Sequence, residues 1–246
     1  MKELSYVVII PARYDSSRFK GKPLIDLCGV PMIVRTYRQC VKACPSEKVF
    51  VACDDERIKK VCEQYGIKVL MTSSNCLTGT DRVAECAQKV DADVYINVQG
   101  DEPVFNAKDL EIFINAVHKF PTEILNGVCE IDDEELFRSP TVPKVVMRAD
   151  GRLLYISRAA IPTNKKNEFI KSWRQVCVYA FPKKTLVTFA GQKVKTPLEQ
   201  IEDIEIIRFL ELGLEVRLIP LSSESLAVDV PDDIAQVEQV IQKRGL

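Results

Sequence analysis

The chain has 246 residues, with 34 lysines and arginines against 35 aspartates and glutamates. This length is enough for a buried core, and the net charge of −1 argues against a protein that wraps duplex nucleic acid, because neutralising phosphates requires a basic excess. No apolar run approaches the roughly 20 residues of a membrane-spanning helix, and no signal peptide precedes the first predicted strand. Nine cysteines without a CxxC pair indicate reduced thiols and predict a cytoplasmic protein.

The composition also limits the chemistry. The only histidine is His118, in a stretch that reads as a helix, where a solvated side chain is the ordinary expectation. A zinc site rich in histidine or a Ser/His/Asp triad would have to rest on that residue. We therefore expect chemistry that uses carboxylates, lysine, arginine and hydroxyls, with a metal that prefers oxygen ligands.

The first half of the chain alternates strands and helices. Tyr6–Ala12 is a continuous apolar run, typical of a strand buried on both faces of a parallel sheet. Further strands are predicted over residues 48–54, 67–72 and 93–98, and helices over residues 31–44, 55–65, 80–90 and 107–119. This alternation predicts an α/β fold with a doubly wound, mostly parallel sheet, whose ligands bind beyond the carboxyl ends of the strands.

The second half has a different pattern. Strand-like pieces at residues 125–131, 144–149, 153–157 and 175–181 are joined by short turns and predict an antiparallel extension. We place it at about residues 125–185, inside a single domain of residues 1–246. Two amphipathic helices, over residues 197–212 and 231–243, flank a last strand at 215–221, and the polar stretch 163–171 is predicted to be a loop.

The most informative segment is the loop that follows the first strand. It carries four cations, two hydroxyls and a glycine: Arg13, Ser16, Ser17, Arg18, Lys20, Gly21 and Lys22. These groups at the end of a parallel strand predict a binding site for a polyphosphate, although a solvated basic loop is the alternative. The segment is neither a Walker A loop nor GxGxxG, which excludes a P-loop NTPase and a Rossmann dehydrogenase.

Two acidic positions are candidates for a magnesium site. Asp101 and Glu102 follow a predicted strand directly, and one acid there suits Mg²⁺ bridging to phosphate oxygens, although a helix cap would also explain them. Asp229 ends another strand and faces a ligand on this interpretation. Asp232 and Asp233 fall in the first turn of the last helix, where acidic residues are ordinary.

In chain order, these segments resemble the 3-deoxy-manno-octulosonate cytidylyltransferases (CMP-Kdo synthetases), and the similarity covers nearly the whole chain. The matching motifs are IPARxxSxRxxGKPL at residues 10–24, VACD at 51–54, GTDR at 79–82, NxQGDEP at 97–103, KVV at 144–146, LYISRA at 154–159 with IP at 161–162, PLEQIE at 197–202, and VD at 228–229. The first motif is long and specific.

The resemblance implies a nucleotidyltransferase-like fold and a cytidylyltransferase. Its partners would be CTP and a 3-deoxy-2-keto sugar acid, either Kdo or an amino or deoxy relative. Its products would be the CMP-sugar and pyrophosphate, for lipopolysaccharide or capsule synthesis. The resemblance also implies Mg²⁺ as cofactor and a homodimer formed through the antiparallel extension. The net charge and the lack of a long apolar run predict no nucleic-acid and no membrane partner.

The resemblance assigns roles to individual residues. The catalytic residues would be Arg13, Lys22, Asp101 and Asp229, and the last two would also bind the metal. CTP would be bound by Ala12, Arg13, Ser16, Arg18, Lys22, Thr80, Arg82 and Gln99. The sugar would be bound by Arg158, Gln175, Tyr179, Glu199 and Gln200, with Arg158 on its carboxylate.

Several positions depart from the family pattern. Cys76 lies near the place of a histidine, Gln175 replaces a histidine, Ile206 replaces a glutamine, and Cys177 and Phe181 also differ. From these changes we hypothesise a preference for a tail-modified relative of Kdo, with drift around an unchanged Kdo site as the alternative.

Two broader alternatives also remain: a nucleotidyltransferase for another sugar acid or sugar phosphate, and an inactive nucleotide-binding relative. The presence of both Asp101 and Asp229 speaks against the inactive relative, because a binding module could dispense with a second metal carboxylate.

Overall fold

A computed structural model describes residues 4–15 and 19–246 of the chain. The strands are β1 (Tyr6–Ala12), β2 (Asp26–Leu27), β3 (Val30–Pro31), β4 (Val49–Cys53), β5 (Val69–Met71), β6 (Val94–Val98), β7 (Ile124–Ile131), β8 (Lys144–Met147), β9 (Leu153–Ser157), β10 (Ser172–Pro182) and β11 (Val216–Pro220). The α-helices are α1 (Met32–Ala43), α2 (Glu56–Gln64), α3 (Gly79–Cys86), α4 (Ala107–Lys119), α5 (Glu134–Arg138), α6 (Lys183–Ala190), α7 (Pro197–Glu202), α8 (Ile207–Glu211) and α9 (Asp233–Arg244).

One large sheet organises these elements, with the strand order β11-β7-β10-β6-β1-β4-β5. The strands β6, β1, β4 and β5 are parallel neighbours, which confirms the predicted parallel sheet of the first half. The long strand β10 enters antiparallel between β6 and β7, while β8 and β9 form an antiparallel hairpin attached to it. Strands β7 to β10 therefore form the expected antiparallel extension, but they are continuous with the main sheet, and β11 pairs parallel to β7 at its edge.

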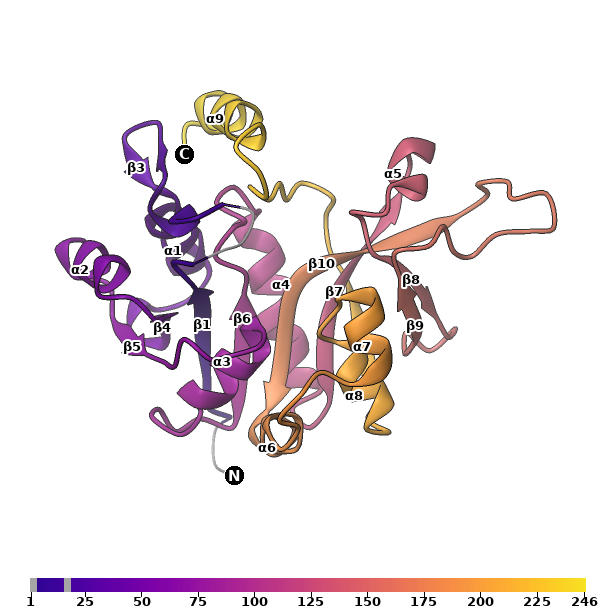
Figure 1. Cartoon of the computed structure of the whole chain (residues 1–246), viewed down its shortest axis with the longest axis horizontal. Coiled ribbons are helices and arrows are strands. Elements are labelled where there is room, and N and C mark those ends of the chain that lie inside the picture. The colour runs from indigo at the N-terminus through magenta and orange to yellow at the C-terminus, as the bar shows by residue number, and fades with distance from the viewer. Residues whose placement is uncertain (1–3, 16–18) are drawn as a thin grey trace.

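Helices cover both faces of the sheet. Along β1, Val8 and Ile10 pack with residues of α1, α2 and α4, whereas Val7 and Ile9 pack with residues of α3, α6 and α8. This division follows from the two-residue period of a strand, which sends alternate side chains to opposite faces. Figure 1 shows this arrangement, with β1 running upward from the N-terminal end toward α9.

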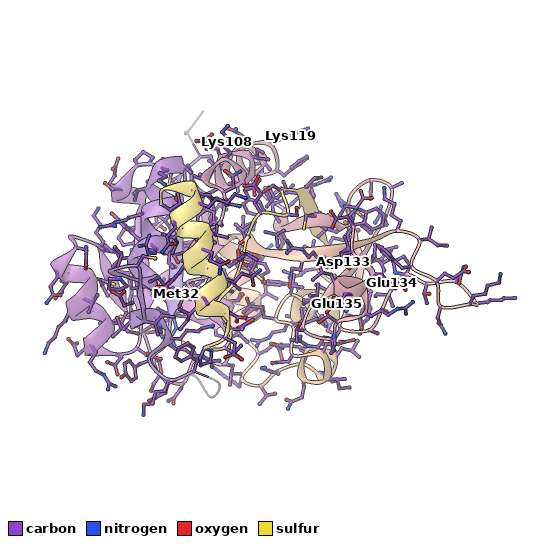
Figure 2. All side chains as sticks on the ribbon, turned by 90° about the horizontal axis from the view of Figure 1, so that it is seen from above. Met32, Lys108, Lys119, Asp133, Glu134 and Glu135 are labelled. Atoms are coloured by element: carbon purple, nitrogen blue, oxygen red, sulfur yellow. The ribbon has the colours of Figure 1, made fainter. Side chains whose placement is uncertain are left out.

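A third, smaller core lies under α9. Val237 and Ile241 of α9 pack on Leu27 of β2, on Met32 at the start of α1, and on Val104 and Val228, which precede α4 and α9. Figure 2 shows α9 crossing the molecule, with Met32 labelled beside it. This packing holds the segment before α9 next to the carboxyl ends of the central strands.

The predicted helix over residues 197–212 is wrong in one respect, because the structure has two short helices there. Asp203 ends α7 with φ of 51°, in the left-handed region, and this conformation stops a right-handed helix. The carbonyls of Glu202 and Asp203 accept hydrogen bonds from Arg158 at 2.6 and 3.2 Å, which stabilises the break. The residues between α7 and α8 are thereby turned toward the sheet.

Other features agree with the sequence or lie close to it. Residues 163–171 contain no helix or strand and extend to one side of the body (Figure 1). All nine cysteines are free thiols. Within the described residues, we find no helix with the length and apolar character needed to cross a membrane.

Candidate active site

A cleft of about 870 Å³ opens at the carboxyl ends of β1 and β6. One wall comes from the ends of these strands and from the start of α3. The opposite wall comes from β10, residues 140–143 and the turn between α7 and α8, and residues 226–236 close a third side. The cleft thus lies where a parallel sheet is expected to bind its ligand.

Most of the predicted site residues lie in this cleft. Those that line it are Ala12, Arg13, Lys22, Arg82, Gln99, Asp101, Arg158, Gln175, Tyr179 and Asp229. Three other predicted site residues, Thr80, Glu199 and Gln200, are not among the described residues that line the cleft. Ser16, Ser17 and Arg18 lie outside the described residues.

Two carboxylates converge on one ammonium group in the cleft. Lys22 Nζ lies 2.6 Å from Asp101 Oδ2 and 3.5 Å from Asp229 Oδ1. The main chain fixes this arrangement, because Val228 N–H donates to the Asp101 carbonyl at 2.9 Å and so holds Asp229 beside Asp101. Gly100 lets the chain after β6 lie close to β1, since a Cβ there would lie 2.7 Å from the Pro11 carbonyl oxygen. A pair of carboxylates gathered around a cation is the kind of site that Mg²⁺ uses.

The other acid of this segment has a different role. Glu102 is buried and accepts a hydrogen bond from the Ser225 hydroxyl. Burial raises the pKa of Glu102, although the Ser225 bond opposes this rise. Asp101 faces the cleft and Glu102 does not, so the structure separates two acids that the sequence leaves equivalent.

The basic side of the cleft is built on the loop after β1. Gly21 adopts a φ of 73° and its N–H donates to the Tyr14 carbonyl at 2.8 Å, which closes the loop and brings Lys22 back to the cleft. Arg13 is exposed and also lines the cleft. Arg82 is buried and its guanidinium is bound by Asp54 at 2.9 Å and by Thr72. Arg82 therefore lines the cleft with its charge already paired.

Arg158 is held on the opposite wall by main-chain carbonyls. Its Nε donates to Glu202 O at 2.6 Å, and its two terminal nitrogens donate to Pro140 O and Asp203 O at 3.1 and 3.2 Å. A guanidinium has five N–H donors, and these three bonds leave a donor available on each terminal nitrogen. Arg158 is thus oriented and still able to bind a carboxylate.

Behind Arg158, a buried lysine supports the same wall. Lys144 Nζ donates to Ser139 O at 2.6 Å and to Arg158 O at 2.7 Å. Burial lowers the pKa of Lys144. This lysine belongs to the KVV motif, and its contacts give that motif a structural role in fixing the backbone of Arg158.

The positions that depart from the family pattern fall into two groups. Cys76, Gln175 and Cys177 line the cleft, and Gln175 Nε2 donates to Asn126 Oδ1 at 2.8 Å. Phe181 and Ile206 are completely buried in the core, where Phe181 stacks on Phe209. The expectation that Phe181 and Ile206 surround the acceptor is therefore wrong, because both side chains contribute to packing.

Glu199 and Gln200 also differ from their predicted position. Glu199 is completely buried, where it accepts two hydrogen bonds from Arg208, at 2.7 and 2.6 Å, and caps α7 through Thr196. Arg208 in turn donates to Asp81 Oδ1 at 2.9 Å. Gln200 is exposed on the outside of α7. The structure thus uses Glu199 as the partner of a buried cation and does not bring either residue into the cleft.

Glu205 is a cleft residue that the sequence prediction missed. Its carboxylate accepts hydrogen bonds from Thr80 N–H at 2.9 Å and from Gln99 Nε2 at 3.2 Å. Thr80 itself is buried, and its main chain supports this contact. Glu205 lies among the acidic residues Glu202, Asp203 and Glu211, so its residue type alone gives little signal, and the break between α7 and α8 turns it toward the cleft.

Comparisons with known proteins agree with this geometry. Residues 7–218 match the sequence profile of the family described as cytidylyltransferase. The chain is 36% identical over 247 residues to the 3-deoxy-manno-octulosonate cytidylyltransferase of Myxococcus xanthus, covering all of both chains. It is 33% identical over 235 residues to the Escherichia coli protein of the same name, covering 96% of this chain and 95% of that one.

The chain belongs to the 3-deoxy-manno-octulosonate cytidylyltransferase family. A solved CMP:2-keto-3-deoxy-manno-octonic acid synthetase, in complex with CTP, has a TM-score of 0.91 and 32% identity to it, over 98% of this chain and 99% of that one. The protein is thus a cytidylyltransferase with the nucleotidyltransferase-like fold that the resemblance implied. For a cytidylyltransferase, the basic loop and the carboxylate pair are the features that suit a nucleoside triphosphate.

Proposed function

We propose that this protein transfers the cytidylyl group of CTP to 3-deoxy-manno-octulosonate (Kdo) and so forms CMP-Kdo and pyrophosphate for lipopolysaccharide synthesis. The observation that carries the proposal is the convergence of Asp101 and Asp229 on Lys22 in a cleft whose opposite wall presents Arg158. The names of the full-length relatives and of the solved synthetase support the choice of CTP and Kdo.

The reaction displaces pyrophosphate from the α-phosphorus of CTP. The anomeric hydroxyl of the sugar forms the new O–P bond, the bond to the β-phosphate breaks, and the hydroxyl proton passes to solvent. Negative charge rises on the phosphates during this exchange, and Arg13 and Lys22 stand where they can stabilise it. Arg18 and Ser16, from the same motif, would add to this stabilisation.

Asp101 and Asp229 are proposed to hold Mg²⁺. The donor set fits, because Mg²⁺ takes one or two carboxylates and completes its shell with phosphate oxygens and water. No cluster of three or more His, Cys, Asp or Glu side chains suited to a metal occurs in residues 4–15 and 19–246, so further ligands must come from substrate and water. When bound, the metal supplies positive charge that lowers the pKa of the sugar hydroxyl.

The sugar is proposed to bind on the Arg158 side of the cleft. Arg158 would pair with the sugar carboxylate through the N–H groups that the main-chain carbonyls leave available. Gln175 and Tyr179, which line the same side, would bind sugar hydroxyls. On the nucleotide side, Ala12 and Gln99 would contact the cytosine.

Release of pyrophosphate from purified protein with CTP, Kdo and Mg²⁺ tests the function directly. Turnover should require both substrates and should be lost with Arg158→Met, which keeps a side chain of similar length without the charge. CTP-dependent turnover with a sugar phosphate in place of Kdo would favour the alternative nucleotidyltransferase. Absence of turnover with all of these acceptors would refute the proposal.

A tail-modified relative of Kdo is a second candidate acceptor. The observation behind it is that Gln175 and Cys177 line the cleft, and that Gln175 holds its amide nitrogen on Asn126. The same hypothesis loses support from Phe181 and Ile206, which lie in the core. Comparing kcat/KM for Kdo with that for amino and deoxy analogues decides between them, and a clear preference for Kdo rejects the second candidate.

Two further properties remain proposals. The free thiols favour a reducing compartment such as the cytoplasm. A homodimer is supported by apolar side chains left exposed on α7 and β9, among them Ile201 at 76% and Leu154 at 55% exposure. Light scattering of the wild type and of Ile201→Asp would test the dimer.

A further inference from the structure

The segment between β11 and α9 carries Asp229 without the support of a regular element. Residues 221–232 contain no helix or strand, and Figure 1 shows them as an irregular stretch that leads to α9. Fixing an irregular backbone costs conformational entropy. Contacts along the segment must therefore set where Asp229 lies.

Two acids near the start of α4 hold this segment through serine residues. Asp109 accepts hydrogen bonds from the Ser222 N–H at 3.1 Å and from the Ser222 hydroxyl. Glu102 accepts the Ser225 hydroxyl, and both of these side chains are buried. The bonds made at residues 223 and 224 lie at the surface. Ser225 is therefore the buried hydrogen-bonding side chain that comes nearest before Asp229.

The Glu102–Ser225 bond joins the segment to the chain that carries Asp101. Glu102 follows Asp101 directly, and Asp101 lines the cleft while Glu102 lines a separate small cavity. Three residues after Ser225, the Val228 N–H donates to the Asp101 carbonyl at 2.9 Å, which sets Asp229 beside Asp101. The two neighbouring acids thus have different tasks, one in the cleft and one behind it.

The surroundings of Glu102 make this bond a defined support. The small cavity has a volume of about 20 Å³ and is lined mainly by apolar residues such as Val98 and Phe105. A carboxyl oxygen accepts a hydroxyl hydrogen whether or not the acid is protonated, so the bond does not depend on the charge of Glu102. The volume is about that of one water molecule, which can satisfy Glu102 when the hydroxyl is removed but cannot hold the segment in place.

We propose that Glu102 is a positioning residue that acts through Ser225 and holds Asp229 beside Asp101 for a shared Mg²⁺. The inference rests on the proposed function, in which Asp101 and Asp229 bind the metal. Neither Glu102 nor Ser225 is among the described residues that line the cleft. Their loss should therefore weaken metal binding and leave most of kcat intact at saturating Mg²⁺.

The test is Ser225→Ala, which removes the hydroxyl and keeps a small side chain. Mn²⁺ serves as the probe, because it also prefers oxygen ligands, and the spin-resonance signal of the free ion reports its binding to the protein alone. The Kd for Mn²⁺ should rise about tenfold, as is usual when a partner that orients a metal ligand is lost. The Mg²⁺ concentration that gives half-maximal turnover should rise in parallel.

Ser223→Ala is the matched control for this substitution. It removes the same hydroxyl two residues away, where the side chain is exposed and the hydrogen bond from Arg174 goes to the main-chain carbonyl. The Kd for Mn²⁺ should stay at the wild-type value. A rise equal to that of Ser225→Ala would mean that any change in the segment weakens the site, and would overturn the inference.

Hydrogen exchange of the metal-free protein separates positioning from a general loss of stability. In Ser225→Ala, the Val228 N–H should exchange about tenfold faster than in the wild type. The Leu221 N–H, which donates to the Val128 carbonyl at 2.8 Å at the start of the segment, should keep its rate. Equal acceleration of both amides would indicate general destabilisation and would contradict the inference.

Variants of Glu102 show whether the effect passes through that acid. Glu102→Ala should raise the Kd for Mn²⁺ as Ser225→Ala does, and combining the two should add nothing. Glu102→Gln keeps an oxygen that can accept the Ser225 hydroxyl, so it should bind Mn²⁺ nearly as the wild type does. An unchanged Kd in Ser225→Ala, or additive losses in the double variant, would refute the role of Glu102.

The outcome is independent of turnover. Hydrogen exchange and Mn²⁺ binding require neither CTP nor the sugar acid. If both measurements give the expected results and the wild type does not convert Kdo, only the proposed function is refuted.

Discussion

The buried pair of Glu199 and Arg208 allows a prediction that separates stability from catalysis. Neither side chain is exposed, and two hydrogen bonds of 2.7 and 2.6 Å join them. Arg208 also packs 3.8 Å from the centre of the Phe189 ring, so an aromatic face covers one side of its charged group. We predict that Glu199→Gln strongly destabilises the protein and has little effect on the binding of the sugar acid.

The magnitude follows from what the substitution leaves behind. Removing one partner of a buried ion pair leaves a charge without compensation, which costs about 3–5 kcal/mol. Asp81 still pairs with Arg208 at 2.9 Å, so we expect the lower end, about 3 kcal/mol. For a domain of this size, that loss corresponds to a fall in Tm of about 6–12 °C.

Urea unfolding of the wild type and Glu199→Gln measures the loss, and kcat/KM for Kdo is measured well below the lower Tm. Gln200→Ala is the matched control, since the resemblance gives it the same role but the structure leaves it exposed. Its unfolding free energy should change by less than about 0.5 kcal/mol. If Glu199→Gln instead keeps its stability and raises KM for the sugar acid, then Glu199 contacts the sugar and the reasoning is refuted.

Three further predictions concern the cleft and its surroundings. Asp101→Asn should lower kcat by about 100-fold, equivalent to about 3 kcal/mol, while the Kd for CTP changes little. Asp229→Asn should have the same effects. A near-normal kcat of either variant at saturating Mg²⁺ would contradict the shared metal site. Lys22→Ala should lower kcat/KM for CTP by an amount equivalent to about 1.5–3 kcal/mol. Lys20 is exposed and paired with Asp15, so Lys20→Ala should have only a small effect on kcat/KM. Equal losses in the two variants would mean that the loop acts only as a diffuse positive field. Because burial raises the pKa of Glu102, the folded state favours its protonated form, so the unfolding free energy should fall as pH rises above 4.5. In urea titrations, Glu102→Gln should flatten that pH dependence, and a pH profile identical to that of the wild type would contradict the burial effect.

Much of the fold could be predicted because the signals were local. The strand Tyr6–Ala12 is found with the predicted bounds, since seven apolar residues in succession suit only a strand buried on both faces. The helix after residue 196 was predicted too long because its apolar spacing continues through the break at Asp203. Nothing in that spacing reports the left-handed residue or the Arg158 contacts that stabilise it.

For the site, the sequence identified residues that end strands and missed what depends on tertiary contacts. The family resemblance paired Asp101 with Asp229, and the structure places both around Lys22. The expectation that Asp229 ends a strand is wrong, because the segment between β11 and α9 contains no strand and is held beside Asp101 by the bond from Val228 N–H. The motif PLEQIE gave no means of distinguishing a ligand-binding acid from a buried one. Glu199 became a partner of Arg208, and Glu205 entered the cleft, for reasons that lie in contacts far apart in the chain.

The contacts of Arg208 and Glu205 connect the α7–α8 side of the cleft with the start of α3. Asp81 binds Arg208 and also the cap residue of α3, Thr78, at 2.7 Å, so the buried cation that pairs with Glu199 supports the helix start that Glu205 contacts. Rigid support of this kind suits a site that must hold a triphosphate in line for displacement. The sugar wall is held differently, by main-chain carbonyls on Arg158, and its side chains such as Gln175 and Cys177 face the cleft without belonging to that ion-pair network. We therefore propose that changes at Gln175 and Cys177 alter the acceptor while leaving the nucleotide side intact, whereas Cys76 lines the cleft beside the start of α3.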